Sequence, residues 1–301
     1  MSSTSIIDLR ADRPLPEIVI EMLLHVAATA DASRLEWFVG GASARDIVLT
    51  HVHGIETTRA TADVDIGVSV ESWTDHAELK AALITDSAFE QRAEAHRLYY
   101  RSPVSGELMW LDIVPFGGVE RSTGSAGAAQ ENEIAWPPDH AVRMNVAGFA
   151  EALGDAISVR LAPDLVVPVA SLPGQALLKI IAWHDRHAID RKDAADLICL
   201  LDNYADAGNQ GRLYDERYDL VEHYGHELES AGAALLGQDA AAIASAQTRD
   251  LVEQILAYDK DYPRILDHMM AHSARFSGPT PALTESLFNA FREGFHGLAL
   301  A

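Results

Sequence analysis

The sequence predicts an α+β fold in which a mixed α/β N-terminal half is followed by an all-helical C-terminal half. Two observations lead to this prediction. Before about residue 170, short β-prone runs alternate with amphipathic segments, and Gly, Pro and Ser residues separate them. After that point, long segments rich in Ala, Leu and Ile keep a helical period. We therefore expect one α/β domain at residues 1–168, with a mixed sheet, and a helical domain at residues 169–301.

The first half begins with a helix and a short strand. Residues 16–30 place apolar side chains at helical spacing behind Pro16, and residues 35–39 form an apolar run that ends at Gly40 and Gly41. The next predicted elements are a helix at 42–50, a polar turn at 51–62, a strand at 63–70, a helix at 76–84, strands at 97–101 and 108–116, a Gly- and Ser-rich loop at 117–133, and strands at 156–162 and 165–170.

The second half contains helical segments separated by Gly and Pro residues, and no short-period internal repeat is evident. The predicted helices span residues 171–184, 191–203, 219–235, 239–258, 262–273 and 281–297.

Composition limits the class of protein. Hydrophobic residues make up 48% of the 301 residues, which is enough for a sizeable core. The longest apolar runs, such as residues 18–24, are too short to cross a bilayer, and the chain does not begin with a signal-peptide pattern. The single cysteine, Cys199, lies in an apolar run and excludes an internal disulfide. We expect a cytoplasmic protein with no membrane partner.

The formal net charge is −22, and both halves of the chain are acidic. The overall field therefore repels a polyanionic partner, which a local patch or a bound metal would have to engage. Lysine is scarce: Lys80, Lys179, Lys192 and Lys260 are the four in the chain.

Gly40 and Gly41 are the first candidate site residues. Without side chains they let the backbone approach a ligand closely, and the helix predicted after them presents free N–H groups to a phosphate. Ser43 adds a hydroxyl to this segment. A tight turn with no ligand is the alternative interpretation.

Asp63 and Asp65 lie two residues apart in a β-prone run, so both carboxylates point to the same face of a strand. Val64 and Ile66 then face the core. Two like charges this close repel each other unless a cation joins them, and oxygen ligands suit Mg²⁺. The alternative is a pair of solvated strand residues.

Asp112 is the third candidate carboxylate. It lies within the strongly apolar run 108–116, where burying an unpartnered carboxylate is costly. A strand beside the one that holds Asp63 and Asp65 would bring all three carboxylates to one site. The alternative is an exposed position on an edge strand.

The order of a diglycine, an Asp-x-Asp strand and a later strand aspartate resembles the polymerase-β-like nucleotidyltransferase superfamily. Residues 40–46, GGASARD, look like the diglycine and Arg-Asp element of tRNA CCA-adding enzymes and their relatives. Residues 179–197 narrow the resemblance. The pattern K-x-x-A-W-x-x-R followed by KD-x-x-D-L is similar to the second half of AbiEii-type nucleotidyltransferases, which include toxins of type IV toxin–antitoxin systems. The resemblance covers residues 35–205.

The resemblance implies roles for these residues. Gly40, Gly41 and Ser43 would hold the triphosphate, with Arg45 and Arg186 as further nucleotide contacts. Asp63, Asp65 and Asp112 would bind Mg²⁺, and Asp112 would also help to deprotonate the attacking hydroxyl. Lys179 would neutralise phosphate charge, and the second motif would add Asp193 as a catalytic residue and Lys192 and Asp196 as nucleotide contacts.

Two of these residues have structural alternatives. Lys179 has the alternative of a surface lysine whose stem lies along apolar neighbours. Asp193 has the alternative of capping the helix predicted at 191–203.

The implied function is Mg²⁺-dependent transfer of NMP from an NTP to a hydroxyl acceptor, with release of pyrophosphate. The acceptor stays open between tRNA, a protein and a small molecule such as an aminoglycoside, which the acidity of the chain favours as a cation. A toxin held off by a cognate antitoxin and a catalytically silent nucleotide-binding protein also stay open.

Two other activities fit the sequence less well. A zinc site at His184 and His187 lacks the intervening Glu and any Cys partner. A glycosyltransferase would need a nucleotide-binding half ahead of the Asp-x-Asp, and about 60 residues precede it here.

Overall fold

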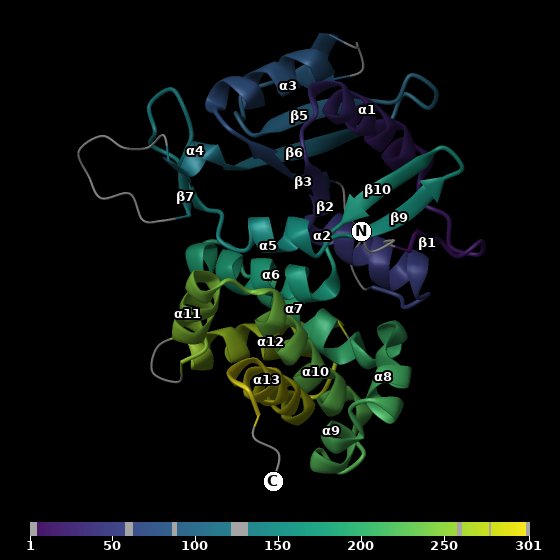
Figure 1. The fold of residues 1–301 in the computed structure, drawn as a ribbon, viewed down its shortest axis with the longest axis vertical. Helices are drawn as coiled ribbons and strands as arrows, with labels where there is room; N and C mark the ends of the chain where they lie inside the picture. The colour runs from purple at the N-terminus through teal and green to yellow at the C-terminus, as the bar shows by residue number, and fades with distance from the viewer. Residues whose placement is uncertain are drawn as a thin grey trace. The chain divides into compact units, whose positions relative to one another are not determined.

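The computed structural model describes residues 5–57, 63–85, 89–121, 132–257, 261–276 and 278–298. The chain divides into two compact units (Figure 1). The first contains Met1–Ile47 and Arg59–Ser171, and the second contains Val48–Thr58 and Leu172–Ala301. No helix in the described part of the chain is long and apolar enough to span a membrane.

The first unit is built on an eight-stranded mixed sheet with the strand order β1-β9-β10-β2-β3-β6-β5-β4. Neighbouring strands are parallel in the pairs β1–β9, β10–β2 and β3–β6 and antiparallel elsewhere. The strands are β1 (Ile7–Asp8), β2 (Trp37–Gly40), β3 (Asp63–Val70), β4 (Phe89–Gln91), β5 (Arg97–Arg101), β6 (Leu108–Gly117), β9 (Ile157–Ala162) and β10 (Leu165–Val169). A separate hairpin joins β7 (Glu133–Ala135) to β8 (Arg143–Asn145).

Helices flank this sheet. They are α1 (Glu17–Ser33), α2 (Gly41–Asp46), α3 (Trp73–Thr85), α4 (Gly118–Arg121) and α5 (Phe149–Gly154). Helix α2 continues into a π-helical segment, η1 (Ile47–Val52). The sequence did not predict α4 or α5, and residues 58–62 and 122–131 of the predicted turn and loop lie outside the described residues.

The alternation along β3 follows the sequence pattern. Val64 and Ile66 are 1% exposed, whereas Asp63 and Asp65 are partly exposed on the opposite face. On that same face, further along the strands, the Phe149 ring of α5 lies 6.0 Å from the Phe38 ring. A Cβ at Gly67 would overlap Phe38, so glycine there allows the close packing of this aromatic ring on β3. The aromatic contact anchors the face that carries the aspartates.

His76 of α3 is buried among aromatic rings, with the Trp73 and Trp136 rings 5.7 and 5.6 Å away. Burial, and secondarily the charge of Lys80, lower the pKa of His76 from 6.5 to about 4. The unfolded chain therefore takes up a proton near pH 6.5, whereas the folded chain does so only near pH 4. The stability of the first unit falls as the pH drops through this window.

We predict that His76→Phe removes part of this pH dependence. Between pH 7 and pH 4 the wild-type protein should lose about 3 kcal/mol of unfolding free energy through His76, because its pKa falls from 6.5 to about 4 on folding and the folded state is itself half protonated at pH 4. Urea unfolding at both pH values measures the loss. In the His76→Phe variant, the drop in unfolding free energy between pH 7 and pH 4 should be smaller by this amount. The same drop in the variant as in the wild type would contradict the prediction.

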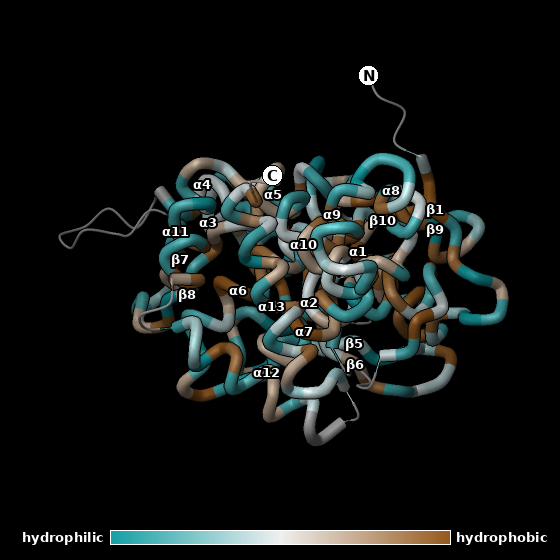
Figure 2. Tube along the Cα trace, turned by 90° about the horizontal axis from the view of Figure 1, so that it is seen from below, coloured by the Kyte–Doolittle hydropathy of each residue, from teal (hydrophilic) through white to brown (hydrophobic). Residues whose placement is uncertain are grey.

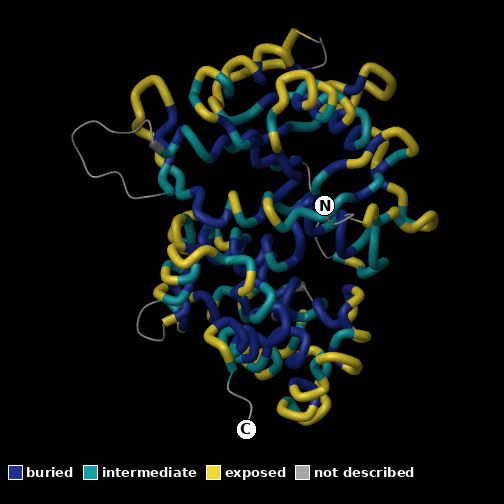
Figure 3. The backbone as a smooth tube through the Cα atoms, in the orientation of Figure 1, coloured by how far each residue is buried: buried dark blue, intermediate teal, exposed yellow. Residues whose placement is uncertain are grey.

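The second unit is helical. Its elements are α6 (Leu172–Arg186), α7 (Lys192–Asn203), η2 (Ala205–Asn209), α8 (Gln210–Asp215), α9 (Tyr218–His223), α10 (Leu228–Ile243), α11 (Ala246–Ile255), α12 (Tyr262–Phe276) and α13 (Pro281–His296). Hydrophilic and hydrophobic residues alternate along the trace (Figure 2), and the helices of this unit combine buried with exposed residues (Figure 3).

Two helix predictions in this unit were wrong in their bounds. The predicted helix 219–235 is broken because Gly225 and His226 adopt left-handed φ angles of 62° and 68°. Helix α10 instead starts at Leu228 and continues through Gly237 to Ile243. The predicted helix 239–258 is likewise two elements, because Ser245 caps α11 by accepting a hydrogen bond from the Thr248 N–H.

Helices α10 and α13 approach closely through glycine. A Cβ at Gly237 would overlap the Phe291 carbonyl oxygen, and a Cβ at Gly294 would overlap the Ala234 carbonyl oxygen. Both atoms belong to helix backbone, so they cannot move aside as a flexible side chain does. We predict that Gly294→Ala lowers the free energy of unfolding by about 1–3 kcal/mol through overpacking.

Gly211→Ala is the matched control, because Gly211 is also helical and a Cβ there meets open space. Alanine is the better helix former, so this variant should be as stable as the wild type or slightly more stable. Thermal unfolding of both variants tests the comparison. Equal melting temperatures for the two would contradict it.

Candidate active site

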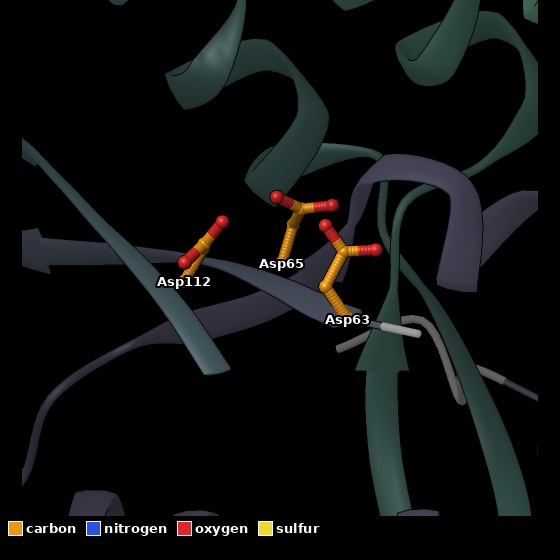
Figure 4. Close-up of side chains that lie close together, drawn as sticks. All are labelled: Asp63, Asp65 and Asp112. Atoms are coloured by element: carbon orange, nitrogen blue, oxygen red, sulfur yellow. The ribbon is translucent and has the colours of Figure 1, made fainter. Parts of the chain in front are cut away.

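Asp63, Asp65 and Asp112 lie together on one face of the sheet (Figure 4). The parallel pairing of β3 with β6 sets Asp65 directly beside Asp112 and Asp63 beside Trp110. Each carboxylate offers one oxygen, and these oxygens all lie within 4.8 Å of one another. The strand register therefore brings together three acids that are up to 49 positions apart in the sequence.

Asp112 is not on an exposed edge. Its strand, β6, has β3 on one side and β5 on the other, and Asp112 is 8% exposed. The alternative of an exposed edge position is thus excluded. Asp63 and Asp65 are partly exposed, and each carboxylate has an oxygen close to those of the other two aspartates.

Arg97 is a site residue that the sequence analysis missed. The antiparallel pairing of β5 with β6 sets Arg97 directly beside Asp112. Its Nε donates to Asp112 Oδ1 at 2.6 Å and its Nη2 to Oδ2 at 2.7 Å. This bidentate salt bridge raises the pKa of the Arg97 guanidinium and fixes the plane of the Asp112 carboxylate. The sequence did predict a strand at 97–101, but it did not show which residue of the neighbouring strand each arginine would face.

The glycine pair forms a tight turn against Asp65. Gly40 pairs with Asp65 across β2 and β3, and Gly41 adopts a left-handed φ of 62°. A Cβ at Gly41 would overlap the Asp65 carboxylate, whereas a Cβ at Gly40 would make ordinary contact with Phe38. The requirement for glycine is therefore strict at Gly41, for both backbone and steric reasons.

Ser43 and Arg45 of α2 are buried behind this turn. The Ser43 hydroxyl donates to the Asp63 carbonyl oxygen at 2.7 Å and so ties α2 to the start of β3. The Arg45 guanidinium donates from Nε and Nη2 to Asp46 Oδ1, at 2.9 and 2.6 Å. The Ser43 bond thus holds the segment next to the aspartates, whereas the Arg45–Asp46 pair lies within α2.

The remaining predicted residues form a charge cluster in the second unit. Lys179 Nζ lies 2.5 Å from Asp196 Oδ2 and 3.4 Å from Asp193 Oδ1. Arg186 donates to Asp193 from Nε at 2.6 Å and from Nη2 at 2.8 Å. Lys179, Asp193 and Asp196 are all buried. Two cations and two anions balance here, as buried charges require.

This cluster bears on the two structural alternatives, a surface position for Lys179 and a helix-capping role for Asp193. Lys179 is 7% exposed and ion-paired, so it is not a surface lysine. The carboxylate of Asp193 accepts from Lys179 and Arg186, while Arg191 is the N-cap residue of α7 and makes no side-chain capping bond. Asp190 accepts from the Lys192 N–H at 3.0 Å, and the Lys192 ammonium lies 3.5 Å from Asp190 Oδ2.

The donor set at the three aspartates fits a hard divalent cation. Carboxylate oxygens suit Mg²⁺ and Mn²⁺ and not the softer metals that prefer thiolate or imidazole. The Arg97 guanidinium already neutralises one of the three charges. Two negative charges are left within one small site, and a bound cation would stabilise them.

Comparisons with known proteins place these residues in context. A model of the nucleotidyl transferase AbiEii toxin family, of type IV toxin–antitoxin systems, matches residues 23–289. The match includes both clusters and extends through most of the segment 206–301, beyond the residues 35–205 that carry the resemblance in the sequence. A search of curated proteins finds no relative that matches the chain.

Solved structures similar to the chain are distant. An antigenic nucleotidyltransferase-like protein from Paracoccidioides brasiliensis is 16% identical, with a TM-score of 0.40, 74% of this chain covered and 94% of that one. A solution structure of the antibiotic-resistance factor ANT(2'')-Ia is 17% identical, with a TM-score of 0.34 and coverages of 70% and 99%. The same factor in complex with adenylyl-2"-tobramycin is 16% identical, with a TM-score of 0.33 and coverages of 73% and 98%.

Proposed function

Since the chain belongs to the AbiEii family of nucleotidyltransferases, we propose that it transfers NMP from an NTP to a hydroxyl acceptor and releases pyrophosphate. The observation that carries this proposal is the convergence of Asp63, Asp65 and Asp112 beside the Gly41 turn. Mg²⁺ is the metal that we assign to the three carboxylates. When bound, it would neutralise phosphate charge and lower the pKa of the acceptor hydroxyl.

The first unit supplies the reacting centre in this proposal. Asp63 and Asp65 hold the metal from β3, and Asp112 holds it from β6 while Arg97 keeps its carboxylate in place. The bare backbone at Gly40 and Gly41 admits the triphosphate next to Asp65, and the Ser43 hydroxyl ties the following helix to β3. Positioning and charge stabilisation are the two effects that phosphoryl-group transfer needs.

The second unit holds its lysine in a fixed position, with Asp193 and Asp196 against the ammonium group of Lys179. We take a role of Lys179 towards phosphate from the family resemblance alone. Arg186 is a further cation at this cluster, and Lys192 pairs with Asp190 at the start of α7. A lysine held by two carboxylates has a fixed position, which a catalytic cation requires and which a mobile surface lysine lacks.

The test is a transfer assay with each of the four NTPs, labelled at the α-phosphate, and Mg²⁺. The acceptors are tRNA, a protein mixture and a panel of aminoglycosides. We expect label to be transferred to one acceptor class and lost on addition of EDTA. Absence of transfer together with absence of Mg²⁺–NTP binding contradicts the proposal, and binding without transfer supports a catalytically silent nucleotide-binding protein.

The family description favours a toxin role as a second candidate function, with a cognate antitoxin as partner. Expression of the chain in a bacterium tests it. Growth arrest that Asp63→Ala abolishes supports a toxin whose activity depends on the aspartate site. Normal growth during expression of the wild-type chain without any antitoxin contradicts this role.

A further inference from the structure

The aspartate site has two different sides along the sheet. A single register row runs from Gly40 on β2 to Asp65 on β3, Asp112 on β6 and Arg97 on β5. The bare glycine turn lies on the β2 side of the carboxylates, and the side chains of β5 and β6 lie on the other. The two sides therefore offer different surfaces to the two substrates.

The β6 side carries an aromatic pair. Trp110 pairs with Asp63 on β3 and with Tyr99 on β5, and both pairings place its side chain on the face of the three carboxylates. The Trp110 and Tyr99 ring centroids are 6.3 Å apart, with planes at 56°. Both residues are partly exposed. In contrast, Trp37, Trp136 and Trp183 are 6% exposed or less.

Arginines surround this pair. The Arg97 guanidinium lies 5.4 Å from the Trp110 ring centroid, and the Arg92 guanidinium lies 3.9 Å from the Tyr99 centroid. Residues 92–101 contain three arginines and a single acid, Glu94, in a chain with 45 acids and 23 lysines and arginines. Aromatic rings interleaved with arginines are a surface that stacks nucleobases and attracts phosphate.

The geometry of in-line displacement decides which substrate lies on which side of the carboxylates. The acceptor oxygen forms a bond to the α-phosphorus, and the bond from this phosphorus to the bridging oxygen breaks, with its electron pair leaving on pyrophosphate. The hydroxyl proton passes to the Asp112 carboxylate. Because attacking and leaving oxygens lie on opposite sides of the phosphorus, a triphosphate at the glycine turn requires the acceptor to enter from the β6 side.

We propose that Trp110 and Tyr99 form an acceptor subsite in which a nucleobase of the acceptor stacks, so that its hydroxyl lies at Asp112. The proposal rests on the function proposed above and names the acceptor as a nucleobase-bearing molecule. Arg97 and Arg92 are ion-paired with Asp112 and Glu90, so this surface would select its acceptor by stacking and not by net charge. A free nucleotide and a polynucleotide end share the same base chemistry, and the assay below distinguishes them.

The test compares Trp110→Ala and Trp110→Phe with Leu108→Ala as control. Leu108 lies on the same strand and the same face, two residues from Trp110, and is also exposed. Loss of stacking in Trp110→Ala should raise the acceptor KM by about tenfold or more. The KM for the NTP should not change. Trp110→Phe should keep the acceptor KM within about threefold, because phenylalanine still stacks.

Two kinetic outcomes would overturn the proposal. One is a raised NTP KM in Trp110→Ala with an unchanged acceptor KM, since the base of the NTP would then occupy the aromatic pair. The other is efficient transfer to tobramycin that Trp110→Ala leaves intact. Leu108→Ala should match the wild type in every KM.

Fluorescence gives a readout that does not depend on turnover. The emission of Trp110 is the difference between the spectra of the wild type and Trp110→Phe. Nucleoside monophosphates and homotrinucleotides, titrated in the presence of EDTA, should quench this Trp110 emission. Tighter quenching by trinucleotides indicates a polynucleotide end, and equal quenching indicates a free nucleotide. No quenching by either contradicts the subsite. If the wild type transfers nothing, the proposed function fails, and this titration still decides the subsite.

Discussion

Asp65→Asn is expected to slow nucleotidyl transfer by at least about 10³-fold while the protein stays folded. Asp65 is the central acid, with Gly40 on one strand and Asp112 on the other. Asparagine keeps the shape but loses the charge that holds a cation, and such a site contributes several kcal/mol to the transition state. Single-turnover transfer and Mn²⁺ affinity measure the loss.

The control is Asp164→Asn, which removes one negative charge from an exposed turn in the same unit. It should leave transfer and Mn²⁺ affinity unchanged. The melting temperature of Asp65→Asn should equal or exceed that of the wild type without metal, because one repulsive charge is gone. Transfer by Asp65→Asn at more than a tenth of the wild-type rate would show that the three aspartates are not the reacting centre.

Gly41→Ala is expected to abolish most activity, by about 10²-fold or more, through geometry and not through charge. Its added Cβ would overlap the Asp65 carboxylate, so either the turn or the carboxylate must move. Displacements of about 1 Å at a reacting centre are enough for a loss of this size. The left-handed φ of 62° adds about 1–2 kcal/mol of backbone strain.

Gly106→Ala separates the steric overlap with Asp65 from the backbone strain of a left-handed φ. Gly106 has a comparable φ of 75°, but a Cβ there meets open space. This variant should lose stability to a similar backbone strain and keep its activity. Rates and melting temperatures of both variants are the measurements. An active Gly41→Ala, or an equally inactive Gly106→Ala, would refute the steric role of the glycine turn.

The sequence predicted the strands of the site closely, because each is a β-prone run bounded by turn residues, and residues 63–70 also alternate between polar and apolar. The predicted strand 63–70 matches β3, 97–101 matches β5, and 108–116 matches β6 to within one residue. Alternation gives the face of each strand but not its neighbours or its register. The convergence of Asp65 with Asp112 was therefore a conditional prediction, and the pairing of Arg97 with Asp112 was not predicted.

Residues that depend on tertiary packing were harder to predict. Gly237 resembled a helix breaker, yet α10 continues through it because α13 packs against it without room for a Cβ. Asp193 resembled a helix cap, yet its carboxylate pairs with Lys179 and Arg186 from the preceding helix. In both cases the local signal was weaker than the contact with another helix.

Asp63, Asp65 and Asp112 should bind a divalent cation as one site. Crystals soaked with Mn²⁺ and a non-hydrolysable NTP, with diffraction recorded at the manganese edge, would reveal this cation. We expect an anomalous peak about 2.0–2.3 Å from oxygens of Asp63, Asp65 and Asp112, with Arg97 still bound to Asp112. A peak elsewhere, or no peak at these carboxylates at saturating Mn²⁺, would contradict it.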